Sequence, residues 1–161
     1  MTQRRRIIIA FIVLIILVAV VLVVDALQRA SGEPTLAPGS IPIYLDGKLV
    51  GSFSPDDLSR LEQVSFVEPE EGKKQEGWLL RDVLLLHVKD KKLKSDSLIT
   101  VSSSSRGRSA QLTWAEVDDP ANLVIFDLSN RGTLKLASVL EKLGTRDEWV
   151  QDVDRVEITS P

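Results

Sequence analysis

Arg106 and Arg108 are the residues of this 161-residue chain whose type and spacing best suit the binding of a ligand. They end the segment Ser102–Arg108, SSSSRGR, in which four consecutive serines come before the two arginines and their intervening glycine. Serine hydroxyls, backbone amides near a glycine and two guanidinium groups suit a phosphate or a carboxylate. The segment lacks the GxxxxGK[ST] pattern of a P-loop. We therefore predict either an anion contact at Arg106 and Arg108 or, as the simpler interpretation, a polar loop between two strands.

His87 is the only histidine of the chain and follows an apolar, helix-like stretch. An imidazole there could act as a general base. Nothing near it in sequence completes a catalytic set, so we interpret His87 as a histidine at the edge of the core. Trp78, Trp114 and Trp149 could stack on a ligand, but each has leucine or valine neighbours. We therefore expect the three tryptophans to anchor the core.

Two acidic groups offer oxygen ligands of the kind that calcium prefers. They are Asp118 with Asp119, and Glu68 with Glu70 and Glu71. Neither group has the ligand spacing of an EF-hand loop. We interpret both groups as solvated turns and predict no metal site.

The absence of cysteine removes several classes of chemistry. Disulfide scaffolds, cysteine-liganded zinc, iron–sulfur clusters and thiol nucleophiles all require that residue. The single histidine also excludes metal sites built from several histidines. We therefore predict no catalytic residues and no cofactor from the residues themselves.

An apolar segment near the amino terminus predicts a membrane anchor. Residues 7–24 are eighteen consecutive apolar residues, and a helix of that length spans about 27 Å, close to the hydrocarbon thickness of a bilayer. Arg4, Arg5 and Arg6 come directly before the segment and Asp25 directly after it. The positive-inside rule then places residues 1–6 in the cytoplasm and the rest of the chain outside. We expect a single-pass protein of the cell membrane, held in the lipid bilayer through residues 7–24.

A cleaved signal peptide is the alternative interpretation of this segment. Val24-Asp25-Ala26 has small or apolar residues at the two positions that a signal peptidase inspects. The apolar run is longer than the usual hydrophobic region of a signal peptide, so we favour the uncleaved anchor. Residues 25–161 hold all 23 acidic residues of the chain and 17 of its 20 basic ones. Such an acidic body is poorly suited to nucleic acid, which we exclude as a partner.

The elements that must position these residues lie after a linker, residues 25–42, whose Pro, Gly and Ser content predicts a flexible spacer. Residues 43–161 are long enough for one domain. Their first elements are a strand 43–45, a turn at Asp46-Gly47, a strand 48–53, a helix from Ser54 as N-cap to about Gln63, a strand 64–67, a charged loop 68–76 and a helix around 80–88.

The second half of the domain alternates short strands with brief helices. We expect a strand 98–101, a polar loop 102–109, a strand through Gln111 and Leu112, a helical turn 114–116 after the N-cap Thr113, a strand 122–128, a turn 129–132, a strand 133–136, a helix 146–151 and a strand 153–158. This order predicts an α+β domain with a mixed or mostly antiparallel sheet.

Four motifs in a fixed order suggest a family. They are Ile43–Gly47 (IYLDG), Ser54–Leu61 (SPDDLSRL), Gly77–Leu84 (GWLLRDVL) and Trp149–Ile158 (WVQDVDRVEI). On these residues the chain resembles the oxidoreductase molybdopterin-binding domain family, whose fold is that of sulfite oxidase. The likeness spans roughly residues 41–159 and implies a sulfite oxidase-like domain.

The resemblance does not extend to the residues that carry the family's chemistry. Enzymes of that family ligate molybdenum through a cysteine in the stretch that corresponds to Val64–Glu76, and this stretch has none. The arginine- and histidine-rich segments that hold the pterin have no counterpart, and the Ser102–Arg108 loop replaces a family segment. The resemblance therefore implies a short, degenerate member, and we expect a non-catalytic binding or assembly module, with a protein partner at the membrane surface. The alternative is a domain that binds molybdopterin or another anionic ligand without a cysteine.

Overall fold

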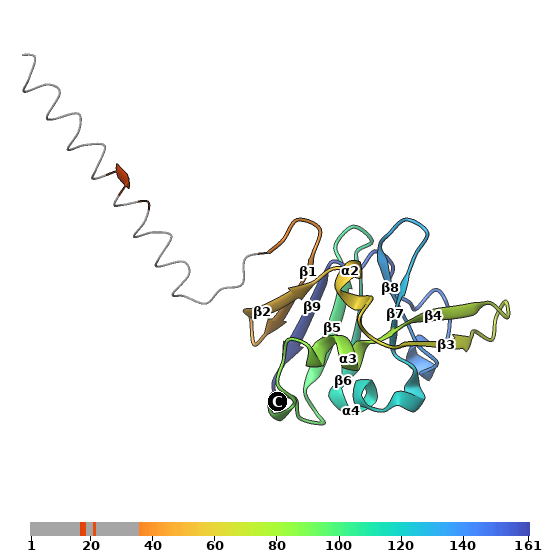
Figure 1. Cartoon of the computed structure of the whole chain (residues 1–161). Coiled ribbons are helices and arrows are strands. Elements are labelled where there is room, and N and C mark those ends of the chain that lie inside the picture. The colour runs from red at the N-terminus through yellow and green to blue at the C-terminus, as the bar shows by residue number, and fades with distance from the viewer. Residues whose placement is uncertain (1–16, 19–20, 22–35) are drawn as a thin grey trace, which may run out of the picture. The chain divides into compact units, whose positions relative to one another are not determined.

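The computed structural model describes residues 17, 18, 21 and 36–161, and residues 36–161 form two β-sheets joined by short helices (Figure 1). The predicted β-rich α+β class is confirmed. The predicted cytoplasmic tail, most of the predicted anchor and linker residues 25–35 lie outside the described residues. In the described part of the chain, no helix combines the length and the apolar character that crossing a membrane requires.

The first sheet has five strands in the order β2-β1-β9-β5-β6. These strands are β1 (Ile41–Leu45), β2 (Lys48–Phe53), β5 (Leu98–Ser103), β6 (Arg108–Thr113) and β9 (Arg155–Thr159). β1 and β9 pair in parallel, and the other neighbours pair antiparallel, so the predicted mixed sheet is confirmed. Asp46 and Gly47 connect β1 to β2 with φ values of 50° and 76°. Positive φ at both turn residues is the geometry that favours Asp-Gly in a two-residue hairpin.

The second sheet has four antiparallel strands in the order β3-β4-β7-β8. These strands are β3 (Gln63–Val67), β4 (Lys74–Leu79), β7 (Ile125–Leu128) and β8 (Leu134–Ala137). Gly77 is required where β4 approaches β7, because a Cβ atom at this position would lie 2.0 Å from the carbonyl oxygen of Phe126. Glycine is common where two backbones come this close.

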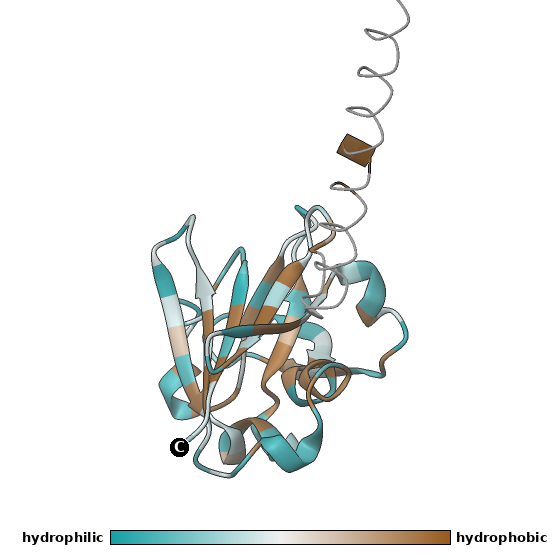
Figure 2. Ribbon diagram, turned by 90° about the vertical axis from the view of Figure 1, so that its left-hand side faces the viewer, coloured by the Kyte–Doolittle hydropathy of each residue, from teal (hydrophilic) through white to brown (hydrophobic). Residues whose placement is uncertain are grey.

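The two sheets share one hydrophobic core. Phe53 of β2 and Phe126 of β7 stack with their ring centroids 5.5 Å apart. Figure 2 shows apolar residues concentrated along the strands, while the turns at the strand ends are hydrophilic. Fully buried side chains come from both sheets and from the helices, among them Ile43, Leu58, Leu80, Leu84, Ile99, Leu112, Leu134, Leu136 and Ile158.

Three predicted helices begin where the sequence places them, namely α2 (Pro55–Leu58), α3 (Leu80–Leu85) and α4 (Trp114–Asp118). The structure adds three 3₁₀ turns that the sequence did not predict, η1 (Asp90–Lys92), η2 (Pro120–Asn122) and η3 (Glu141–Leu143). The Ser54 amide donates to the Asp57 carboxylate at 2.8 Å, and the Thr113 amide donates to Glu116 at 2.7 Å. Both predicted N-caps are confirmed as capping boxes.

Several predicted boundaries are wrong. Helix α2 ends at Leu58 rather than at Gln63, because Gln63 already pairs with Trp78 in the β3–β4 hairpin. The predicted loop 68–76 ends at Lys73, since β4 begins at Lys74. Strand β1 begins at Ile41, two residues before the predicted start of the domain.

The later part of the chain departs from prediction in three places. Strands β5 and β6 extend into the predicted loop 102–109 and leave only the turn 104–107. Strand β7 begins at Ile125, because residues 120–122 form η2. The predicted helix 146–151 is absent, since Val150 instead forms an isolated β-bridge with Leu136 of β8. Pairing with β8 therefore overrides the local helical pattern.

Candidate functional site

The two predicted anion contacts lie next to each other at one end of the first sheet. Arg106 belongs to the turn between β5 and β6, and Arg108 is the first residue of β6. Both line a hollow of about 180 Å³, together with Arg146, Asp147, Trp149 and Gln151. Sequence reasoning missed Arg146, because it lies nearly forty residues further along the chain and was assigned to a helix.

The three arginines of the hollow differ in their partners. Arg106 pairs with Asp152 through a 2.6 Å contact from Nε to Oδ2. Arg146 pairs with the carboxylate of Glu71. Arg108 donates from Nη1 to the carbonyl oxygen of Asp147. Among the described residues no carboxylate lies within ion-pair distance of Arg108. Arg108 is therefore the group best placed to receive an external anion.

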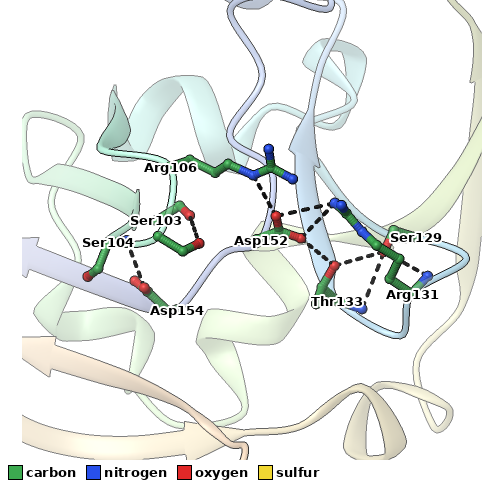
Figure 3. Close-up of polar contacts among 9 residues, drawn as sticks. Ser103, Ser104, Arg106, Ser129, Arg131, Thr133, Asp152 and Asp154 are labelled. Atoms are coloured by element: carbon green, nitrogen blue, oxygen red, sulfur yellow. Dashed lines mark hydrogen bonds and ion pairs between the residues drawn. The ribbon is translucent and has the colours of Figure 1, made fainter.

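Asp152 connects the turns of the two sheets (Figure 3). Its carboxylate accepts hydrogen bonds from Arg106 of the β5–β6 turn, from Arg131 of the β7–β8 turn at 2.9 Å and from the Thr133 hydroxyl at 2.7 Å. The hydrogen bond from Thr133, followed by that from Arg106, holds the pKa of Asp152 below its usual range. The carboxylate and the Arg106 guanidinium thus serve to join the two hairpin turns.

The serines of the predicted anion loop bond within the protein. Ser103 is buried, and its hydroxyl lies 3.2 Å from that of Ser105. The Ser104 amide donates to the Asp154 carboxylate at 2.7 Å (Figure 3). An anion at this turn would therefore have to replace existing contacts.

His87 lies just after α3 and packs against β2. A Cβ atom at Gly51 would lie 2.6 Å from its Nδ1, and the Phe53 ring centroid lies 6.5 Å away. The buried Nε2 has no hydrogen-bond partner among the described residues. Burial lowers the pKa of His87, and the nearby Asp57 opposes this effect. This placement agrees with a histidine at the edge of the core.

Glu68 is not the solvated residue that the sequence predicts, because it is only 1% exposed. Its Oε2 accepts a hydrogen bond from the Glu70 amide at 2.9 Å. Its Oε1 accepts hydrogen bonds from the amides of Glu71 at 3.0 Å and Lys73 at 3.3 Å. A single carboxylate thus satisfies three backbone donors and shapes the β3–β4 turn. Burial of a polar group is tolerated when it is hydrogen-bonded in this way.

The other acidic pair lies at the end of α4 and also has partners within the protein. Asp118 pairs with Arg81 at 2.9 Å, and Asp119 accepts from the Ala121 amide at 2.9 Å at the start of η2. In the part of the chain that the structure describes, no group of three histidine or acidic side chains is arranged to hold a metal ion.

The three tryptophans are core residues, as predicted. Trp78, Trp114 and Trp149 are 6%, 4% and 3% exposed. Trp149 also donates from Nε1 to the Leu143 carbonyl at 2.8 Å, which fixes the segment that borders the hollow.

Comparisons with known proteins give no relative from which to assign this site. No protein-family model matches the chain, and no curated protein matches it at a significant level. The arrangement itself can hold an anion at Arg108.

Proposed function

We propose that the chain is a membrane-anchored, extracytoplasmic binding or assembly module without catalytic activity. The apolar segment 7–24, with its preceding arginines, supports the anchor. One observation carries the binding role: carboxylates that could perform chemistry hold the fold together, while Arg108 has no carboxylate partner among the described residues. Asp152 joins two hairpin turns, and Glu68 satisfies three backbone amides.

We further propose that residues 41–159 keep a sulfite oxidase-like framework without its metal chemistry. The motifs behind this resemblance occupy the end of β1 and its turn, helix α2, the junction of β4 with α3, and most of β9 with the segment before it. The stretch Val64–Glu76, which corresponds to the molybdenum-binding stretch, forms most of the β3–β4 hairpin. It contains no thiol, and its buried acid, Glu68, is saturated by backbone amides. These residues do not fit a molybdenum centre.

Metal analysis and a topology assay test this proposal together. The full chain, purified in mild detergent from its native host, should contain far less than one molybdenum per chain. Cysteine substituted at an exposed position such as Ser59 should react with an impermeant thiol reagent in intact cells. The native chain has no cysteine to give a background signal. Stoichiometric molybdenum, or a Ser59→Cys chain labelled only after lysis, contradicts the proposal.

The hollow around Arg108 supports a second candidate, in which the domain binds molybdopterin or another anionic ligand without thiolate ligation. This candidate predicts that the Arg106→Ala/Arg108→Ala double variant loses the small-molecule mass that the native chain retains in native mass spectrometry. Arg131→Ala is the matched control, because it removes a contact to the same Asp152 without altering the lining of the hollow. Retention of the mass by the double variant, or no retained mass on the native chain, contradicts this candidate.

A further inference from the structure

Strand β6 ends the first sheet, and no other described strand pairs with its outer edge. The Trp114 amide donates to the Ser97 carbonyl at 2.8 Å and so continues the β5–β6 ladder. Because hydrogen-bonded pairs alternate along an antiparallel ladder, Ser109 and Gln111 direct their N–H and C=O groups away from β5. Outside that ladder, no hydrogen bond among the described residues uses these four backbone groups.

A groove runs along this free edge. Its lining consists of Arg108–Gln111 of β6 together with Lys142, Leu143 and Glu148, around a volume of about 310 Å³. Arg108 also lines the hollow of the candidate site, so the two depressions adjoin. An extended backbone lies about 4.8 Å from its neighbour in a sheet. A segment that lies at this distance from β6 within the groove can reach the outward backbone groups of Ser109 and Gln111.

Arg108 is the basic side chain of the two depressions that has no carboxylate partner among the described residues. The other three, Arg106, Arg146 and Lys142, already pair with carboxylates elsewhere in the domain. A guanidinium group has five N–H donors, and the contact with the Asp147 carbonyl uses Nη1 of Arg108. Arg108 can therefore also pair with a carboxylate that enters the groove.

We propose that the edge of β6 binds an extended acidic segment of a partner protein as an added strand. Ser109 and Gln111 exchange backbone hydrogen bonds with the segment, and Arg108 pairs with one of its Asp or Glu side chains. Strand addition of this kind takes its affinity from the main chain and its specificity from side-chain contacts. The inference rests on the proposed binding function and adds the chemistry of the partner.

Selection from a library of random octapeptides displayed on phage, against the full chain in detergent micelles, tests this proposal. The enriched peptides should carry Asp or Glu among β-branched residues and should lack proline. Gln111→Pro removes the outward amide and should weaken binding of an enriched peptide at least tenfold. Arg108→Gln should weaken it at least fivefold, and peptide binding should slow hydrogen exchange at the amides of Ser109 and Gln111.

Matched controls come from elsewhere in the domain. On the edge strand β3, the Glu68 amide donates to Lys73 at the end of the β3–β4 ladder, so the Ser65 amide also points outward. Ser65→Pro and Arg60→Gln should each change peptide affinity less than twofold. Should Gln111→Pro fail to fold, Arg108→Gln and hydrogen exchange still decide the question.

Two results overturn the β6 proposal: no peptide enriched above the starting library, or enriched peptides that bind all four variants equally. A protein that co-purifies with the chain and binds Gln111→Pro and Arg108→Gln unchanged overturns it as well. That last result leaves the proposed binding function intact. Stoichiometric molybdenum in the native chain would instead contradict the proposed function, and it would leave the proposal of strand addition at β6 untouched.

Discussion

Replacing Glu68 by glutamine tests whether its carboxylate stabilises the fold or serves as a metal ligand. The side chain is 1% exposed and accepts three backbone N–H groups, two of them on Oε1. Glutamine keeps one carbonyl oxygen, which can replace Oε1 and retain two of these bonds. Its amide NH₂ then faces the Glu70 N–H, which loses its acceptor.

The expected loss of stability follows from that one lost hydrogen bond. A hydrogen bond to a charged group contributes roughly 1.5–3 kcal/mol, and so Glu68→Gln should lower the free energy of unfolding by about that amount. For a domain of this size, a loss of about 1 kcal/mol corresponds to roughly 3–6 °C in Tm. The midpoint of thermal unfolding, followed by circular dichroism on the full chain in detergent, should therefore fall by about 5–15 °C.

The control for this change is Glu62→Gln, at an exposed glutamate on the approach to β3. A surface change of that kind should alter stability by less than about 0.5 kcal/mol. Millimolar calcium should leave the Tm of the native chain unchanged. A Glu68→Gln variant as stable as the native chain, or a calcium-induced rise in Tm that this variant loses, would refute the structural role.

Three further changes probe the fold. Gly77→Ala places a Cβ atom 2.0 Å from the Phe126 carbonyl oxygen, so denaturant unfolding should show that the free energy of unfolding falls by about 3 kcal/mol. Wild-type stability would contradict the geometry. Trp149→Phe leaves the Leu143 carbonyl without its donor, and the same assay should show a loss of about 1–3 kcal/mol. Burial lowers the pKa of His87, so the unfolded chain protonates first as the pH falls below about 6.5. Native stability should therefore decline from pH 6.5 towards pH 5 relative to that of His87→Gln, and parallel stability curves for the two proteins would exclude this effect.

The parts of the fold that could be predicted are those determined by residues close together in the sequence. Asp46 and Gly47 both adopt positive φ, which the Asp-Gly pair favours, and the hairpin around them is confirmed. Ser54 and Thr113 have acidic residues three positions later, and each starts a helix with a capping box. Such signals operate within four residues and do not depend on the rest of the chain.

The errors arise where distant contacts decide the structure. Lys74 and Glu76 look like part of a charged loop, yet they are the exposed positions of β4. The inward residue between them is Gln75, a polar side chain that accepts from Lys135 at 2.8 Å, so no apolar alternation marked the strand. Val150 was predicted to be helical, but it forms a β-bridge with Leu136 of β8 instead.

The candidate site could be predicted only in part for the same reason. Arg106 and Arg108 were identified because they are adjacent in sequence to serines and a glycine. Arg146 and Asp152 lie roughly forty positions further along the chain, and only the packed fold brings them close to the two arginines. The engagement of Arg106 with Asp152 is therefore a property of the tertiary structure.

Native mass spectrometry of the full chain, released from its own membranes in mild detergent, decides between a binding module and a cofactor-dependent domain. We expect the chain to appear in a defined stoichiometry with another protein, and without the mass of a molybdenum–pterin group. A chain that appears alone and carries that mass on every copy would contradict the proposed function.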